Sequence, residues 1–310
     1  MPSIDVSTHA TPVAADLGRL EALPRRVALT LAELRFLAAL AGDAPLPFDL
    51  SEPAPDALAD RLGQGRTGTE DQAYAEALAT LHEPADSLTR RGLVTEGVGD
   101  AGVLGALGLL ARPALALDLD VIAGGIRAKA WHRQSGAAVA TLATSDGIVF
   151  ELAWFDVAQW PDELARVAVV PEDVELGPSQ VPDLLDLPYE LLDGCGEAIR
   201  TQRSDLVPVL VAAHTGQVTD GAGEPVTEAT VAPLVNALLV ETRGRLRVLA
   251  ADVAADDVSV VGVVSWLLLA DGWRSLRAHQ RGAERRVEVR RVVPSDLAPL
   301  LAPVLSEVSA

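Results

Sequence analysis

Cysteine is almost absent from this chain, which has one thiol in 310 residues. A single cysteine cannot form an internal disulfide, so a secreted scaffold held by disulfides and a metal site built from cysteines are both excluded. Basic side chains are also scarce, with 25 Lys and Arg against 44 Asp and Glu and a net charge of −19. Because nucleic-acid binding needs a basic surface that neutralises phosphates, we expect no nucleic-acid partner.

Long apolar runs are missing as well. The longest, residues 258–270, lies between two aspartates and is 13 residues long, whereas a helix that spans a bilayer needs about 20. Its β-branched residues favour a strand covered on both faces of a sheet. Asp5, His9 and Asp16 interrupt any apolar core of a signal peptide. We therefore expect a cytoplasmic protein without membrane insertion, and the 49% hydrophobic content excludes a disordered chain.

Helical patterns dominate the first third of the chain. Residues 1–26 have no sustained periodicity and are predicted to be a poorly ordered leader, and the Pro- and Gly-rich segment 43–68 is predicted to be a loop. Thr30 with Glu33 three residues later forms the signature of a capping box at a helix start. The helices expected here are 30–41, 70–91 with a kink at Pro84, and 102–111.

The apolar period then changes to two, as Leu115, Leu117 and Leu119 alternate with Ala116, Asp118 and Asp120. Gly124-Gly125 and Asp146-Gly147 stand where turns between strands are needed. The expected strands are 115–119, 126–133, 137–144 and 148–155, followed by a helix over 161–167.

The second half repeats this order of elements. Helices are expected at 183–200, 204–213 and 227–242, strands at 246–253, 258–269, 273–279 and 287–293, and a last helix at 296–308. The sequence thus predicts an α+β fold with a quasi-twofold duplication of helices, four strands and a helix, merged into one central, mostly antiparallel sheet. Residues 27–310 would form a single domain of two pseudo-repeats, about 27–170 and 183–310, after the leader 1–26.

A glycine motif offers one route to catalysis. Gly97, Gly99 and Gly102 match G-x-G-x-x-G, and Asp118 and Asp120 follow at the distance of a ribose-binding acid. The preceding strand is weak, the acids Glu96 and Asp100 would repel a phosphate, and the chain continues in hairpins. A dinucleotide-binding enzyme that uses residues 97–102 therefore stays an alternative, and a plain loop is the favoured interpretation.

Other reactive side chains show no catalytic arrangement. Cys195 stands between Asp193 and Glu197 rather than in an electropositive setting, which favours a structural thiol. The five histidines have no metal-binding spacing. The carboxylate pairs Asp118/Asp120 and Asp256/Asp257 are interpreted as solvated strand ends rather than acid–base pairs.

Arginine is concentrated near the C-terminus. Residues 243–291 contain ten arginines and six acids, a local charge of +4 in an acidic chain. These arginines could steer an acidic partner, but protection of edge strands against aggregation is the favoured interpretation.

The strand expected at 126–133 carries unlike faces. Ile126, Ala128 and Ala130 form one, and Arg127, Lys129, Trp131 and Arg133 form the other. Trp and Arg are common in protein interfaces, so the second face suits a protein contact. Cation–π packing along a solvated strand explains it equally well.

The element order and several local segments resemble the EspG family of type VII (ESX) secretion-associated proteins of actinobacteria. The resemblance covers about residues 28–308. It rests on the helix Thr30–Ala41, a long helix running into Arg91-Gly92-Leu93-Val94, the segment Leu109-Leu110-Ala111-Arg112-Pro113 before the strand Leu115–Leu119, Ile126-Arg127-Ala128-Lys129-Ala130, and the hairpin at Ser135-Gly136.

This resemblance implies a quasi-twofold fold with helical bundles beside a central sheet. It also implies a cytosolic chaperone, not an enzyme, which binds a helical PE–PPE-like substrate before export and needs no nucleotide, metal or other cofactor. A homodimer is possible. The binding surface implied by the family matches residues 131–136 and the helices after 183. With the charged face of the same strand, the predicted partner-binding residues are Arg127, Lys129, Trp131, Arg133, Gln134, Ser135 and Gly136.

Overall fold

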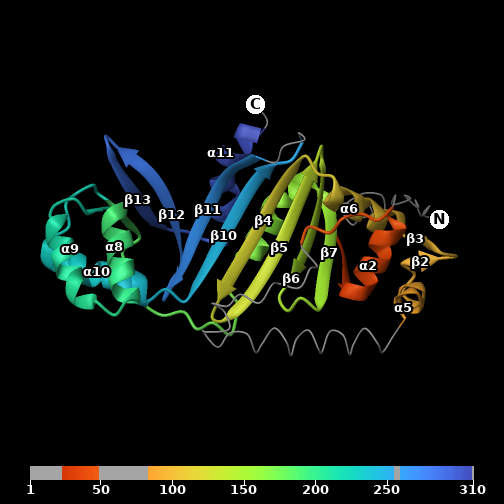
Figure 1. Cartoon of the computed structure of the whole chain (residues 1–310), viewed down its shortest axis with the longest axis horizontal. Coiled ribbons are helices and arrows are strands. Elements are labelled where there is room, and N and C mark those ends of the chain that lie inside the picture. Colours follow the sequence, from red (N-terminus) through yellow and green to blue (C-terminus); the bar gives the residue numbers. More distant parts are fainter. Residues whose placement is uncertain (1–22, 49–82, 255–258, 309–310) are drawn as a thin grey trace, which may run out of the picture.

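A single antiparallel sheet of eleven strands organises the molecule (Figure 1). The computed structural model describes residues 23–48, 83–254 and 259–308. Strand order across the sheet is β1-β7-β6-β5-β4-β10-β11-β12-β13-β8-β9. The first half contributes β1 (Arg25–Thr30), β4 (Leu115–Ala123), β5 (Ile126–Ser135), β6 (Ala138–Thr144) and β7 (Val149–Asp156). The second half contributes β8 (Leu184–Pro188), β9 (Thr219–Asp220), β10 (Gly244–Asp252), β11 (Ser259–Leu269), β12 (Gly272–Arg281) and β13 (Glu284–Arg291).

Each half repeats the same plan about the central pair β4–β10. A four-strand meander starts at the centre, and the strand that opens the half pairs with the last strand of that meander: β1 with β7, and β8 with β13. In the second half the two-residue β9 pairs outside β8. Because β4 and β10 are themselves antiparallel, a pseudo-twofold axis passes between them. The predicted α+β class with quasi-twofold duplication is confirmed.

Helices connect and cover the strands. Those of the first half are α2 (Leu31–Leu40), α5 (Pro84–Arg90), α6 (Ala101–Ala111) and α7 (Trp160–Val167), with the small hairpin β2 (Val94–Thr95) and β3 (Val98–Gly99). Those of the second half are α8 (Tyr189–Arg200), α9 (Val207–Ala213), α10 (Glu228–Val240) and α11 (Leu297–Val308). Short 3₁₀ turns span Val157–Gln159, Ser204–Leu206 and Pro294–Asp296.

The two faces of the sheet are covered differently. One face, here called the closed face, packs its centre against α7 and α11 through a core that includes Leu117, Val248, Trp160 and Leu301. The other, the open face, carries α2, α5 and α6 on one end and α8, α9 and α10 on the opposite end. Figure 1 shows these bundles at opposite ends of the sheet. No described helix packs over the centre of the open face.

The helix starts show which local signals were decisive. The Thr30 hydroxyl accepts the Glu33 N–H at 3.2 Å and the Glu33 carboxylate accepts the Thr30 N–H at 2.9 Å, as the predicted capping box requires. Pro84 does not kink a helix. It occupies the first turn of α5 after extended Glu83, where a missing N–H costs nothing. Residues 70–82 of that predicted helix lie outside the described part.

The opening strand of each half was missed from the sequence. Arg25 and Arg26, assigned to the leader, begin β1, and residues 184–188, assigned to a helix, form β8. Leu185 and Leu187 are fully buried under α8, so alternation was present but too short to outweigh the helical pattern that follows. Residues 1–22 of the leader lie outside the described part.

The expectation that β11 is covered on both faces is wrong for its first half. Val260 is 60% exposed and Val263 45%. Both side chains point to the open face, where no described helix covers the start of β11. β12 leaves one edge of this segment open as well, because it pairs with β11 only over Ser265–Leu269.

Gly244 is where the two halves meet most closely. A Cβ added there would lie 2.3 Å from the carbonyl oxygen of Ile122 on β4. We expect Gly244→Ala to lower the free energy of unfolding by about 1–3 kcal/mol, because backbone must move to make room. The matched control is Gly105→Ala on α6, which has open space around it and should gain about 0.5–1 kcal/mol. Urea denaturation measures both, and a Gly244→Ala variant as stable as wild type would contradict the close β4–β10 contact.

Candidate partner-binding surface

The centre of the open face is built by four neighbouring strands, β5, β4, β10 and β11. Side chains alternate between the two faces along a strand, and the residues of β4 and β10 that pack on the closed face fix which ones point to the open face. We call the resulting set the central strip. Its members are Asp118, Asp120 and Ile122 on β4, Arg127, Lys129 and Trp131 on β5, Arg245, Arg247 and Leu249 on β10, and Val263 and Ser265 on β11.

Strand register brings charges from both halves into one row. Asp120 is opposite Lys129 on one side and Arg247 on the other. The next row places Ile122 between Arg127 and Arg245. These rows connect residues more than 110 positions apart in the sequence, which only the β4–β10 pairing makes neighbours.

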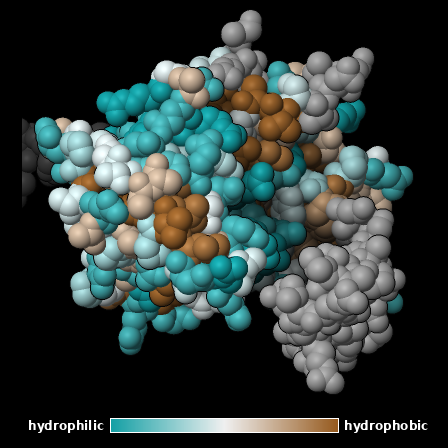
Figure 2. All heavy atoms as spheres, turned by 60° about the vertical axis from the view of Figure 1, so that its left-hand side comes forward, coloured by the Kyte–Doolittle hydropathy of each residue, from teal (hydrophilic) through white to brown (hydrophobic). Residues whose placement is uncertain are grey.

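Two carboxylates on the strip are neutralised locally. Asp120 accepts from Arg127 at 3.0 Å, and an Asp118 oxygen lies 2.8 Å from the Arg133 guanidinium. Arg133 also donates to the Leu117 carbonyl at 3.0 Å. A cavity of about 290 Å³ opens beside Asp118 and Asp120 and is bordered also by Lys129, Trp131, Arg247 and Leu249. Figure 2 brings the α8–α10 side of the molecule forward. It shows a hollow in which hydrophilic groups predominate, with apolar groups beside it.

The predicted site residues separate into two kinds. Arg127 and Lys129 are exposed, as expected. Trp131 and Arg133 point to the same face but are each only 8% exposed, so the expectation of a free aromatic surface is wrong. Trp131 packs in the core beneath α2 and α6, with its ring centroid 5.0 Å from that of Phe48. The alternation was interpreted correctly, but sequence periodicity does not show which end of a face a helix will cover.

Gln134, Ser135 and Gly136 lie far from the basic end of β5. They form the turn into β6, where the Gln134 amide donates to the Gly136 carbonyl and Gly136 adopts a positive φ of 57°. At about 3.4 Å per residue, this turn is roughly 30 Å along the strand from Arg127. The structure therefore groups Arg127 and Lys129 with Arg245 and Arg247, which were not predicted, rather than with the turn.

His132 lies on the opposite side of β5 and locks that strand to α7. The Trp160 indole N–H donates to His132 Nδ1 at 2.9 Å. Burial, followed by the nearby charges of Arg166 and Arg133, lowers the pKa of His132 to about 3. The imidazole is therefore neutral and acts as an acceptor, a structural role beneath the strip.

The glycine motif does not form a dinucleotide site. Gly97 and Gly99 belong to the β2–β3 hairpin, not to a strand–turn–helix unit. The N-terminus of α6 is occupied by the Asp100 carboxylate, which accepts from Gly102 N–H at 2.9 Å and Val103 N–H at 3.0 Å. A pyrophosphate would need those donors, and the acids expected to hold a ribose are paired with arginines on the strip.

The remaining candidate groups are structural where they are described. Cys195 is buried in the α8–α10 bundle, and burial raises the pKa of its thiol, so it is not an activated nucleophile. Within residues 23–48, 83–254 and 259–308, no cluster of three His, Cys, Asp or Glu side chains is placed to hold a metal. Asp256 and Asp257 lie outside these ranges. No helix in the same ranges has the length and apolarity to cross a bilayer.

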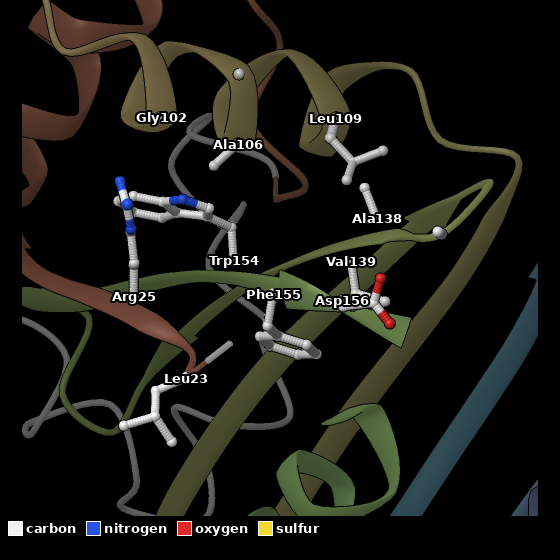
Figure 3. A pocket seen from close by; sticks show the side chains of 12 residues that line it. Leu23, Arg25, Gly102, Ala106, Leu109, Ala138, Val139, Trp154, Phe155 and Asp156 are labelled. Atoms are coloured by element: carbon white, nitrogen blue, oxygen red, sulfur yellow. The ribbon is translucent and has the colours of Figure 1, made fainter. Parts of the chain in front are cut away.

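A second hollow lies between α6 and the ends of β6 and β7 (Figure 3). It encloses about 660 Å³. Gly102, Ala106 and Leu109 on α6 face Trp154 across it, and Arg25 lies beside the Trp154 ring. Phe155 lines the hollow from the end of β7, with its ring turned away from α6. Sequence reasoning missed this hollow. The small residues at 102, 105 and 106 were its only local signal.

Comparison with known proteins finds a match in structure alone. No protein-family model matches the sequence, and no curated protein matches it. Among solved structures, the chain is similar to the Mycobacterium tuberculosis type VII secretion system chaperone EspG5, determined in complex with a PE25–PPE41 dimer. The TM-score is 0.59 with 13% sequence identity, over 91% of this chain and 96% of that chain. The fold of the chain is EspG-like. This agreement confirms the predicted resemblance at the level of architecture, over nearly the full length of both chains.

The buried His132 predicts a specific pH dependence. Its pKa in the folded state, about 3, is below the ordinary 6.5, so between these values the unfolded chain binds the extra proton and acid favours unfolding. Relative to His132→Gln, wild type should lose about 2 kcal/mol of unfolding free energy between pH 7 and pH 5. Trp160→Phe is the control, because it removes the hydrogen bond but keeps the buried imidazole and hence the pH dependence. An unchanged difference between wild type and His132→Gln at the two pH values would show that the imidazole titrates normally.

Proposed function

We propose that this protein is a cytoplasmic chaperone of a type VII secretion system, which binds a helical PE–PPE-like pair and keeps it soluble before export. The observation that carries the proposal is the EspG-like fold across 91% of the chain, shared with a chaperone whose structure was determined with a PE25–PPE41 dimer. A chaperone role requires a docking surface and no reactive group, which agrees with the inert settings of Cys195 and of the glycine motif.

The choice of docking surface follows from which face is free. The closed face packs its centre against α7 and α11, so a partner there would have to displace a core. The open face has the central strip between two helical bundles, a recess that can receive a partner without rearrangement of either bundle. We assign the partner to the open face.

The predicted site residues then have different roles. Arg127 and Lys129 would contact the partner directly, since both are exposed. Trp131 and Arg133 would support the strip from its margin, Trp131 by packing against α2 and α6 and Arg133 by the ion pair to Asp118. Gln134, Ser135 and Gly136 would form a separate contact at the far turn, reached only by a partner that extends along β5.

Co-expression tests this function directly. Each PE–PPE-like pair encoded by the source genome is produced in a heterologous host, with and without the chain, and the soluble fraction of the pair is quantified. We expect one pair to move from the insoluble to the soluble fraction and to copurify with the chain. Light scattering of the purified complex separates this result from self-association, because a homodimer through the strip would exclude the pair.

The control is an unrelated acidic protein co-expressed at the same level, which separates specific chaperoning from a general solubility effect of a chain with net charge −19. If every pair partitions identically with and without the chain, the chaperone function is wrong.

A further inference from the structure

The central strip is a basic island on an acidic protein. Arg127, Lys129, Arg245 and Arg247, with Arg133 at its margin, face two carboxylates, Asp118 and Asp120, a local charge of +3. The whole chain carries −19. An acidic surface of a partner is therefore attracted to the strip and repelled by the rest of the protein. Both effects act over distances up to the screening length of about 8 Å.

The ion pairs of the strip leave its cations in surplus. Arg127 forms an ion pair with Asp120, and Arg133 forms one with Asp118. Lys129, Arg245 and Arg247 are exposed, and none of them forms an ion pair within the described part of the chain. Register puts Lys129 and Arg247 on either side of Asp120. These three side chains are therefore available to carboxylates from outside.

An apolar margin adjoins the cations. Leu249 is opposite Val263 in the row beside Arg247, and Val263 and Val260 are 45% and 60% exposed. A surface complementary to this arrangement has acidic and aliphatic side chains side by side, as the edge of an amphipathic helix does. Four strands spaced about 4.8 Å apart span roughly 14 Å, which accommodates one helix of about 10 Å diameter.

We propose that the central strip binds an acidic helical segment of the partner, with its Asp or Glu side chains on Lys129, Arg245 and Arg247 and an adjacent aliphatic side chain on Leu249 and Val263. This inference rests on the proposed chaperone function for its biological partner and goes beyond it by naming the chemistry of the segment. It also makes β10, from the second half of the chain, an equal contributor with β5.

A nucleic acid fits the same surface less well. A phosphate backbone would meet Asp118 and Asp120 inside the strip and the negative charge of the body around it. Nucleic-acid affinity depends on many phosphate contacts, whereas three free cations within one recess suit a short row of carboxylates.

Charge reversal tests the inference on the copurifying pair. Arg245→Glu/Arg247→Glu should weaken binding about 10- to 100-fold, as measured by isothermal titration calorimetry or biolayer interferometry, with a steep dependence on salt in wild type. The matched control is Arg35→Glu/Arg281→Glu, which changes net charge by the same four units at exposed positions on α2 and β12. Replacing the partner's contacting carboxylates with Arg should restore binding to the Arg245→Glu/Arg247→Glu chain.

Equal affinities for the two double variants would overturn the inference while leaving the chaperone function intact. If no pair binds wild type, the chaperone function fails, and the strip is tested alone with an alanine-based helical peptide that has a Glu stripe beside a Leu stripe. The inference is supported if this peptide binds wild type more tightly than a version with Gln in place of Glu, and if that difference is lost in the Arg245→Glu/Arg247→Glu chain. Equal or absent binding of the peptides, or tighter binding of a DNA duplex through the same arginines, overturns it.

Discussion

The antiparallel pairing of β4 with β10 is the constraint on which the rest of this structure depends. It joins the two halves over nine residue pairs, Ala123–Gly244 at one end and Leu115–Asp252 at the other. Alternation along both strands then sends the aliphatic residues to the closed face and the charged residues to the open face. Burying those charges without partners would cost several kcal/mol each, so the helical bundles of the open face cannot close over its centre. The recess is a consequence of the charge pattern of the central pair.

The same pairing explains why the two faces have different uses. On the closed face, Leu117, Val248 and Leu301 belong to one core that makes α7 and α11 part of the fold. On the open face, each bundle has its own core, one around α2 and α6 and the other around α8 and α10. The centre of the open face therefore lies between two helical bundles that are packed separately from each other. This is the arrangement on which the proposed docking of a helical partner rests.

Most elements could be predicted from the sequence because their signals are local. Thr30 and Glu33 mark a helix start by themselves, and the alternation in β4 marks a strand. Strands β1 and β8 were missed because each is short and is followed at once by a helix, so that pairing with the distant meander of its half decides its conformation. The exposure of Val260 was missed for a similar reason, since nothing local in β11 indicates that the helical bundles leave this part of the open face uncovered.

Of the exposed cations on the central strip, those of β5 were named from the sequence and those of β10 were not. Arg127 and Lys129 stood out on one strand, but Arg245 and Arg247 were interpreted as protection for edge strands, because nothing local indicates that β10 lies at the centre of the sheet beside β4. Trp131 was expected on a free surface because periodicity assigns a face but not its cover. The acids beside the glycine motif were the local signal against a phosphate site. One of them, Asp100, caps the helix whose N–H groups a phosphate would need.

The most direct test of the open face as the docking surface is site-specific photo-crosslinking in the complex with the PE–PPE-like pair. Benzoylphenylalanine replaces Val263, exposed on the central strip, or Val169, exposed just beyond α7 on the other side of the sheet. We expect crosslinks to the pair from position 263 and none from position 169. Crosslinks from position 169 alone would contradict this expectation and place the partner on the closed face.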